Sequence, residues 1–113
     1  MEELNSALPL IYRITEESKN IIKSLQNSIK SIKDSNKLKA ADLEEQVQAE
    51  IKVWETKMEK LGGHPKGVFL VDFDNGEGYY CWKFPEVSIK FHHGYQEGFT
   101  SRVEISKSEE IEL

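Results

Sequence analysis

The chain has 113 residues, a formal net charge of -5 and a single cysteine. This length is typical of one domain, and one cysteine leaves no disulfide within the chain. The sequence shows neither a secretory signal pattern nor the roughly 20 apolar residues that a bilayer-spanning helix needs, so we expect a cytoplasmic, thiol-reduced protein without a membrane partner. Because the charge balance is acidic and no Lys/Arg-rich face stands out, we also expect no nucleic-acid partner.

Residues 1–34 are predicted to form the first helix. Pro9 cannot donate a backbone hydrogen bond, so it should lie in the first turn or mark a kink. Two adjacent isoleucines, Ile21 and Ile22, widen the apolar stripe and predict contacts with more than one neighbour. The apolar side chains recur mostly at the intervals of three and four that mark one face of a helix. They are Leu4, Leu8, Ile11, Ile14, Ile21, Ile22, Leu25, Ile29 and Ile32.

Residues 38–62 are predicted to form the second helix. The turn-forming segment Asp34-Ser35-Asn36 separates it from the first, and Gly62-Gly63 suits its C-terminus. A short connection between two apolar stripes predicts an antiparallel helical hairpin. The second stripe steps by four, four, three, four and three through Leu43, Val47, Ile51, Trp54, Met58 and Leu61.

From residue 67 to residue 105 the pattern becomes that of strands. Branched and aromatic residues with a period of two fall in 68–73, 79–84, 87–92 and 99–105, and residues 74–78 have the composition of a hairpin turn. We expect a small, mainly antiparallel sheet covered by the hairpin, which makes the fold α+β. The acidic tail, residues 106–113, is weakly patterned, and its end is expected to be disordered. The triplets expected to share a face are Phe69, Val71 and Phe73; Tyr80, Trp82 and Phe84; and Val87, Ile89 and Phe91.

Short motifs along the chain occur in an order typical of a known family. They are Glu2-Glu3-Leu4-Asn5 with Leu8-Pro9, Leu70-Val71-Asp72-Phe73, Cys81-Trp82-Lys83 followed by Glu86, His93, and Gly98-Phe99-Thr100-Ser101-Arg102. Over nearly the whole chain this pattern resembles a widespread prokaryotic family catalogued as domain of unknown function 2203. The resemblance implies a helical hairpin followed by a sheet and implies no activity. Gly94 departs from the pattern, because an acidic residue usually follows the histidine, and this weakens any mechanism that needs a carboxylate beside His93.

Cys81 and the histidines are residue types used in nucleophilic catalysis. A cysteine thiolate needs a nearby base or positive charge, which His92 or His93 would supply. The opposing interpretation is stronger, because a lone cysteine next to Trp82 on a strand favours a small, buried and inert thiol. We therefore expect Cys81 and Trp82 to lie inside the protein.

His93 and Asp72 are the candidate metal ligands. Imidazole and carboxylate groups are ligands that zinc accepts, and His64, His92, Asp74 and Glu97 offer further donors. Adjacent histidines on a strand point to opposite faces, so only one of His92 and His93 joins a given site. The spacing matches no paired-histidine or paired-cysteine signature.

Arg102 is the remaining candidate, with Glu86 or Asp72 as its partner. A guanidinium can pair with a carboxylate through two hydrogen bonds, and such an ion pair would tie the last strand to the sheet. The functional alternative is a pocket for an acidic small molecule, lined by Trp82, Glu86, His93 and Arg102.

Two function classes therefore stay open. The first is a non-enzymatic cytoplasmic interaction or scaffold module, and the second is a small metal- or acidic-ligand-binding enzyme centred on His93, Glu86 and Arg102. The sequence leaves catalytic activity and any cofactor unknown. Helices of about 30 and 24 residues reach roughly 45 and 36 Å, which is longer than six-residue strands can cover. We therefore expect a homodimer whose hairpins form a four-helix bundle, through Ile21, Leu25, Ile29, Leu43 or Val47.

Overall fold

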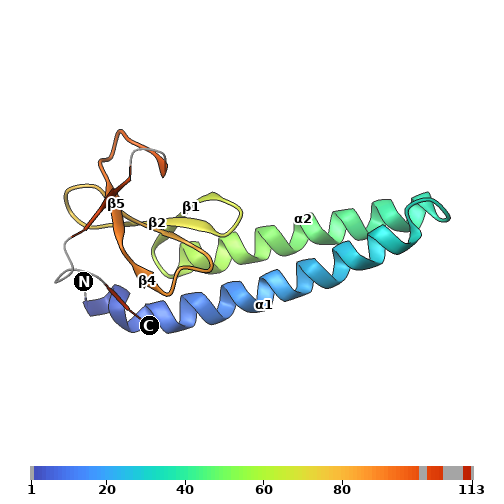
Figure 1. Ribbon diagram of the computed structural model, residues 1–113, viewed down its shortest axis with the longest axis horizontal. Helices are drawn as coiled ribbons and strands as arrows, with labels where there is room; N and C mark the ends of the chain where they lie inside the picture. Colours follow the sequence, from blue (N-terminus) through green and yellow to red (C-terminus); the bar gives the residue numbers. More distant parts are fainter. Residues whose placement is uncertain (1, 100–101, 106–110, 113) are drawn as a thin grey trace.

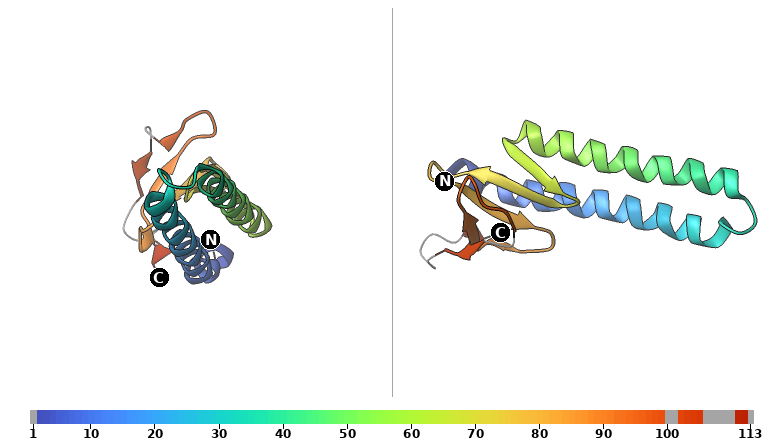
Figure 2. Two further views of the ribbon diagram at one scale, coloured as in Figure 1. Left: turned by 90° about the vertical axis from the view of Figure 1, so that its right-hand side faces the viewer. Right: turned by 90° about the horizontal axis from the view of Figure 1, so that it is seen from above.

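Two long antiparallel helices form a hairpin that projects beyond a small sheet in the computed structural model, which describes residues 2–99, 102–105 and 111–112 (Figure 1). Helix α1 spans Glu2–Ile32 and helix α2 spans Lys37–Lys60. The sheet covers the end of the hairpin where α1 begins and α2 ends, and the loop between the helices lies at the uncovered end (Figure 2). The predicted hairpin is confirmed. Within the described residues no helix is long and apolar enough to cross a membrane.

The hairpin is defined by its caps and by one buried hydrogen bond between the helices. The Asn36 side chain accepts the backbone N–H three residues further on at 3.0 Å, and Gly62 follows α2 with a φ of 87°. The indole N–H of Trp54 donates to Oγ1 of Thr15 at 2.8 Å, and that hydroxyl donates to the Ile11 carbonyl at 2.8 Å. Every polar group of this buried contact has a partner, so it fixes the register of α1 against α2 without a desolvation penalty.

The main sheet has five antiparallel strands, which confirms the α+β fold. In spatial order these are β1 (Gly63–Gly67), β2 (Leu70–Asp74), β3 (Tyr79–Lys83), β5 (Phe91–His93) and β6 (Val103–Glu104). A second sheet pairs β4 (Ser88–Ile89) with β7 (Ile111–Glu112).

The predicted strand boundaries need three corrections. First, a strand at 63–67 was not expected, because its sequence has no apolar alternation; backbone pairing with β2 forms it, with Pro65 on the edge strand of the sheet. Second, the predicted strand 68–73 begins only at Leu70, because Val68 and Phe69 form the turn after β1, and Phe69 has a φ of 60°. Third, the predicted strand 87–92 is divided at Lys90 into β4 and β5, which belong to different sheets.

The predicted end of the chain also differs. Disorder was expected at the end of the tail, but Ile111–Glu112 forms β7 against β4, while 106–110 and 113 lie outside the described residues. The predicted strand 99–105 is reduced to Val103–Glu104, with Thr100 and Ser101 outside the described residues.

The two faces of the main sheet have different roles. Val71 pairs with Trp82 across β2 and β3, and their side chains face the helices. The core on this face comprises Leu8, Ile11, Trp54, Met58, Val71, Phe73, Trp82 and Ile89. The next pair along the same strands, Asp72 and Cys81, must point to the opposite face, because side chains alternate along a strand. This outer face carries the candidate site.

Candidate functional site

Three potential metal-ligand side chains meet on the outer face of the sheet. Asp72 on β2 lies directly opposite Cys81 on β3, and His93 lies on β5, the next strand across. One donor atom from each, a carboxylate oxygen, the thiol sulfur and an imidazole nitrogen, lies within 4.8 Å of the other two. All three residues are buried. The strand register thus brings together residues that are up to 21 positions apart in the chain.

Both ring nitrogens of His93 face hydrogen-bond acceptors. Nε2 lies 2.9 Å from Oδ2 of Asp72, and Nδ1 lies 2.9 Å from the carbonyl oxygen of Gly94. Because a carbonyl oxygen only accepts, Nδ1 carries a proton, which leaves Nε2 directed at Asp72. Burial lowers the pKa of His93, but the Gly94 carbonyl and the Asp72 carboxylate together raise it above its ordinary value of 6.5.

The Cys81 thiol is held in its protonated form. Burial, helped by the charge of Asp72, raises the pKa of the Cys81 thiol to about 11, although Arg102 acts in the opposite direction. The side chain is 1% exposed, so the expected burial is confirmed. Its location needs a correction, however: Trp82 lies in the core against the helices, whereas Cys81 lies on the outer face beside Asp72 and His93.

A cavity of about 330 Å³ opens beside this cluster. Asp72 and His93 line its inner part, and Tyr95, on the loop after β5, donates a hydrogen bond to Asp74 at 2.9 Å. Glu97 accepts the backbone N–H of Gly94 at 3.0 Å. The cavity therefore combines aromatic walls with acidic groups. Its other lining residues are Lys66, Leu70, Tyr79, Gly98 and Phe99.

Arg102 pairs with Glu86 on the outer face of the sheet, near enough to Cys81 to act on the pKa of its thiol. Its Nη1 lies 3.1 Å from Oε2 and 3.3 Å from Oε1 of that carboxylate, and the guanidinium packs on the rings of Phe91 and Phe99 at 3.9 and 4.2 Å from their centroids. The backbone carbonyl of Glu86 also accepts the indole N–H of Trp82 at 2.8 Å. Glu86, rather than Asp72, is thus the partner of Arg102.

The sequence of this chain matches the family model described as uncharacterized conserved protein (DUF2203) over residues 1–105. The chain belongs to this family. The search of curated proteins found no match, and the search of solved structures found none either.

The motif residues of this DUF2203 protein do not form one pocket. His93 and Asp72 join the buried cluster, Glu86 and Arg102 bind each other, and Trp82 fills the core on the helix-facing side. The guanidinium of Arg102 adjoins the buried cluster at Cys81, whereas Trp82 lies on the other side of the sheet, so the four candidates are divided between its two faces. The sequence did not predict that Cys81 would join Asp72 and His93 as a third donor. It also did not predict that Tyr79 and Tyr95 would line the cavity beside them.

The remaining polar candidates lie outside the cluster. His92 pairs with Tyr80 across β3 and β5, on the face opposite to that of His93. His64 is exposed, with its ring 5.7 Å from that of Tyr79. Asp74 accepts hydrogen bonds from the Gly76 N–H and from Tyr95, and these bonds lower the pKa of its carboxyl group.

Proposed function

We propose that this DUF2203 protein binds a transition-metal ion through Asp72, Cys81 and His93. The observation that carries the proposal is the convergence of three different donor types, all buried and within 4.8 Å of one another, beside a cavity. Carboxylate, thiolate and imidazole are the donors that zinc takes in proteins. Burying such groups carries a desolvation cost that a bound cation would help to offset.

The surroundings of His93 also suit a metal ligand. The hydrogen bond from Nδ1 to the Gly94 carbonyl is the outer contact that typically orients a ligating imidazole and leaves Nε2 free for the ion. Three protein ligands leave one position of a tetrahedral zinc site open, as in catalytic sites rather than structural ones. The cavity beside Asp72 and His93 would give a small acidic ligand access to that position, with Lys66 at its wall.

Isothermal titration of metal-free protein with zinc, manganese and nickel tests the proposal. We expect saturable zinc binding with one site per chain, at least tenfold weaker in His93→Gln and in Cys81→Ser. His92→Gln is the matched control, because it removes the neighbouring imidazole from the other face and should leave binding unchanged. Cobalt should give a thiolate charge-transfer band that Cys81→Ser abolishes. The site would be rejected if no metal bound below millimolar concentration. It would also be rejected if His92→Gln lost as much zinc affinity as His93→Gln.

An interaction role is the second candidate, and we propose the cytoplasm as the compartment. The specific observation that favours interaction is that the hairpin projects past the sheet (Figure 1). The cytoplasmic assignment rests on composition, since the single cysteine has no partner within the chain. Light scattering tests the interaction role. If the projecting helices bind nothing, not even a second copy of the chain, this role fails while the metal site stands.

A further inference from the structure

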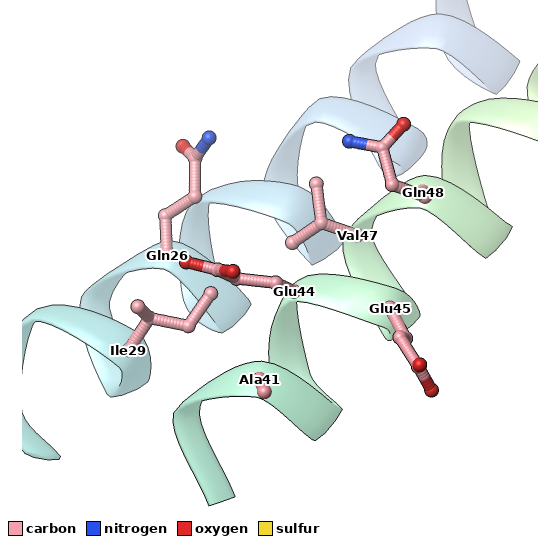
Figure 3. Close-up of a pocket in the computed structure, with 7 residues that line it drawn as sticks. All are labelled: Gln26, Ile29, Ala41, Glu44, Glu45, Val47 and Gln48. Atoms are coloured by element: carbon pink, nitrogen blue, oxygen red, sulfur yellow. The ribbon is translucent and has the colours of Figure 1, made fainter. Parts of the chain in front are cut away.

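The two sides of the projecting hairpin differ in charge. Lys19, Lys23 and Lys30 lie on one face of α1 together with Gln26, because these positions step by four, three and four. This face borders a groove of about 610 Å³ between the helices, where Gln26 lies opposite Glu44 and Gln48 of α2 (Figure 3). We call this the groove face. Residues half a turn away from Gln26 lie on the opposite side of α1, which we call the back face. They form an uncharged row that consists of Ile21, Ser24, Ser28 and Ser31.

The back face carries exposed apolar side chains. Ile21 is 48% exposed on α1, and Val53 is 43% exposed on α2. Leu10 extends the α1 row toward the sheet end and is also exposed. Their neighbours Ile22 and Trp54 are buried within the hairpin, so the exposed side chains face away from the intramolecular contact. Small serines beside Ile21 would let another helix approach closely, and on α2 the half-buried Glu50 lies one turn before Val53 in the same row.

Opposite charges flank this apolar centre at the sheet end of the hairpin. Glu17 precedes Ile21 by one turn on the back face of α1, and Lys57 follows Val53 by one turn on the back face of α2. In the part of the chain that the structure describes, no ion pair joins Glu17 to Lys57. The Thr15–Trp54 contact places Lys57 about 7 Å nearer the sheet than Glu17 along the hairpin. Because helical side chains tilt toward the N-terminus of their own helix, the two side chains lean toward each other, and a two-fold partner can satisfy both.

We propose that a second copy of this chain covers the back face, with a two-fold axis parallel to the helices. This symmetry lays α1 of each protomer against α2 of the other, so Ile21 packs near Val53 of the partner and Glu17 pairs with Lys57 of the partner, twice. Both sheets then lie on the outside of a four-helix bundle, because the groove side of each hairpin faces its own sheet, where Nζ of Lys19 lies 5.2 Å from the centroid of the Phe84 ring. The groove faces remain free, and their lysine rows never face each other.

This interface differs in part from the residues expected from sequence. Leu43 and Val47 are already buried within one hairpin, and Ile29 lines the groove, so none of them belongs to the back face. Ile21 is retained at the centre. This dimer rests on the interaction role proposed above, whereas the metal site plays no part in the contact, so the dimer and the metal site stand or fall separately.

Multi-angle light scattering of the full chain at 10 to 200 micromolar tests the proposal. We expect a mass of twice 13.0 kDa at the upper concentrations. Ile21→Glu should shift the protein to the monomer, while the matched control Gln26→Glu, which adds a charge on the groove face, should leave the dimer intact. A monomer at 200 micromolar, or equal disruption by both variants, would overturn the proposal.

Charge reversal tests the pairing itself. Lys57→Glu alone and Glu17→Lys alone should each weaken self-association at least tenfold, and the double variant should restore it. Circular dichroism checks that each variant keeps the helical content of the native chain. Failure of the folded double variant to recover the dimer would overturn the Glu17–Lys57 contact and with it the two-fold arrangement.

Discussion

The imidazole of His93 and the carboxylate of Asp72 lie 2.9 Å apart, between Nε2 and Oδ2, with side chains only 2% and 3% exposed. A buried contact of this kind is stable only with a shared proton or a bound cation, because two acceptors in direct contact repel each other. The backbone carbonyl of Gly94 fixes the other ring nitrogen as a donor. In metal-free protein the pair therefore holds a proton between the two side chains.

The stability of metal-free protein should depend on pH through His93. Its pKa is raised in the folded state, so the stabilisation from the protonated ring is fully present below the ordinary value of 6.5 and is lost as pH rises through the raised pKa. Chemical denaturation with a chelator present should show that the difference in unfolding free energy between the native chain and His93→Gln is full just below pH 6.5 and shrinks at higher pH. A difference that grows with pH would contradict a raised pKa.

The hairpin could be predicted from sequence because its signals are local. The stripe from Leu43 to Leu61 and the break at Asn36 each act within a few residues, and the helices follow them. Strand β1 lacks such a signal, because Gly63-His64-Pro65-Lys66-Gly67 owes its extended form to pairing with β2. Apolar periodicity in a sequence reflects the burial of side chains, and most side chains of β1 are not buried.

The site could be predicted only in part, for a related reason. Asp72 and His93 were recognised as donors, but their meeting with Cys81 depends on the register between β2, β3 and β5, which turns and pairing set together. One signal was present in the sequence. Alternation that places Val71 and Trp82 toward the helices requires their neighbours Asp72 and Cys81 to share the other face.

Loss of the Arg102 guanidinium should destabilise the fold. Arg102→Ala removes two charge-assisted contacts with Glu86 and the packing on Phe91 and Phe99, and we expect the unfolding free energy to fall by about 2 to 3 kcal/mol. Arg102→Lys keeps the charge without the planar guanidinium. Its free energy of unfolding should lie between those of the native chain and the alanine variant. Urea denaturation measures both. An unchanged transition in Arg102→Ala would instead favour a role of the guanidinium in binding a ligand.

Trp82 should contribute strongly to stability as a core residue. The ring is fully buried, and its N–H has a backbone partner in Glu86, so Trp82→Ala should cost about 3 to 5 kcal/mol. Trp82→Phe keeps most of the apolar contact but leaves the Glu86 carbonyl without this donor, and its cost should be smaller. Thermal and urea unfolding provide the comparison. A loss below about 1 kcal/mol in the alanine variant would place the ring outside the core.

Gly78→Ala should disturb the site through the backbone rather than through any ligand. A Cβ on Gly78 would collide with the carbonyl oxygen of His93 and would lie 3.0 Å from the Cα of Gly94, and neither atom can move without shifting β5. Such overpacking costs about 1 to 3 kcal/mol. Because the shift separates β5 from β3, we also expect faster iodoacetamide labelling of Cys81. Gly98→Ala is the matched control, since a Cβ there meets nothing within 4 Å. Equal labelling rates in the two variants would show that the position of His93 does not depend on the close approach at Gly78.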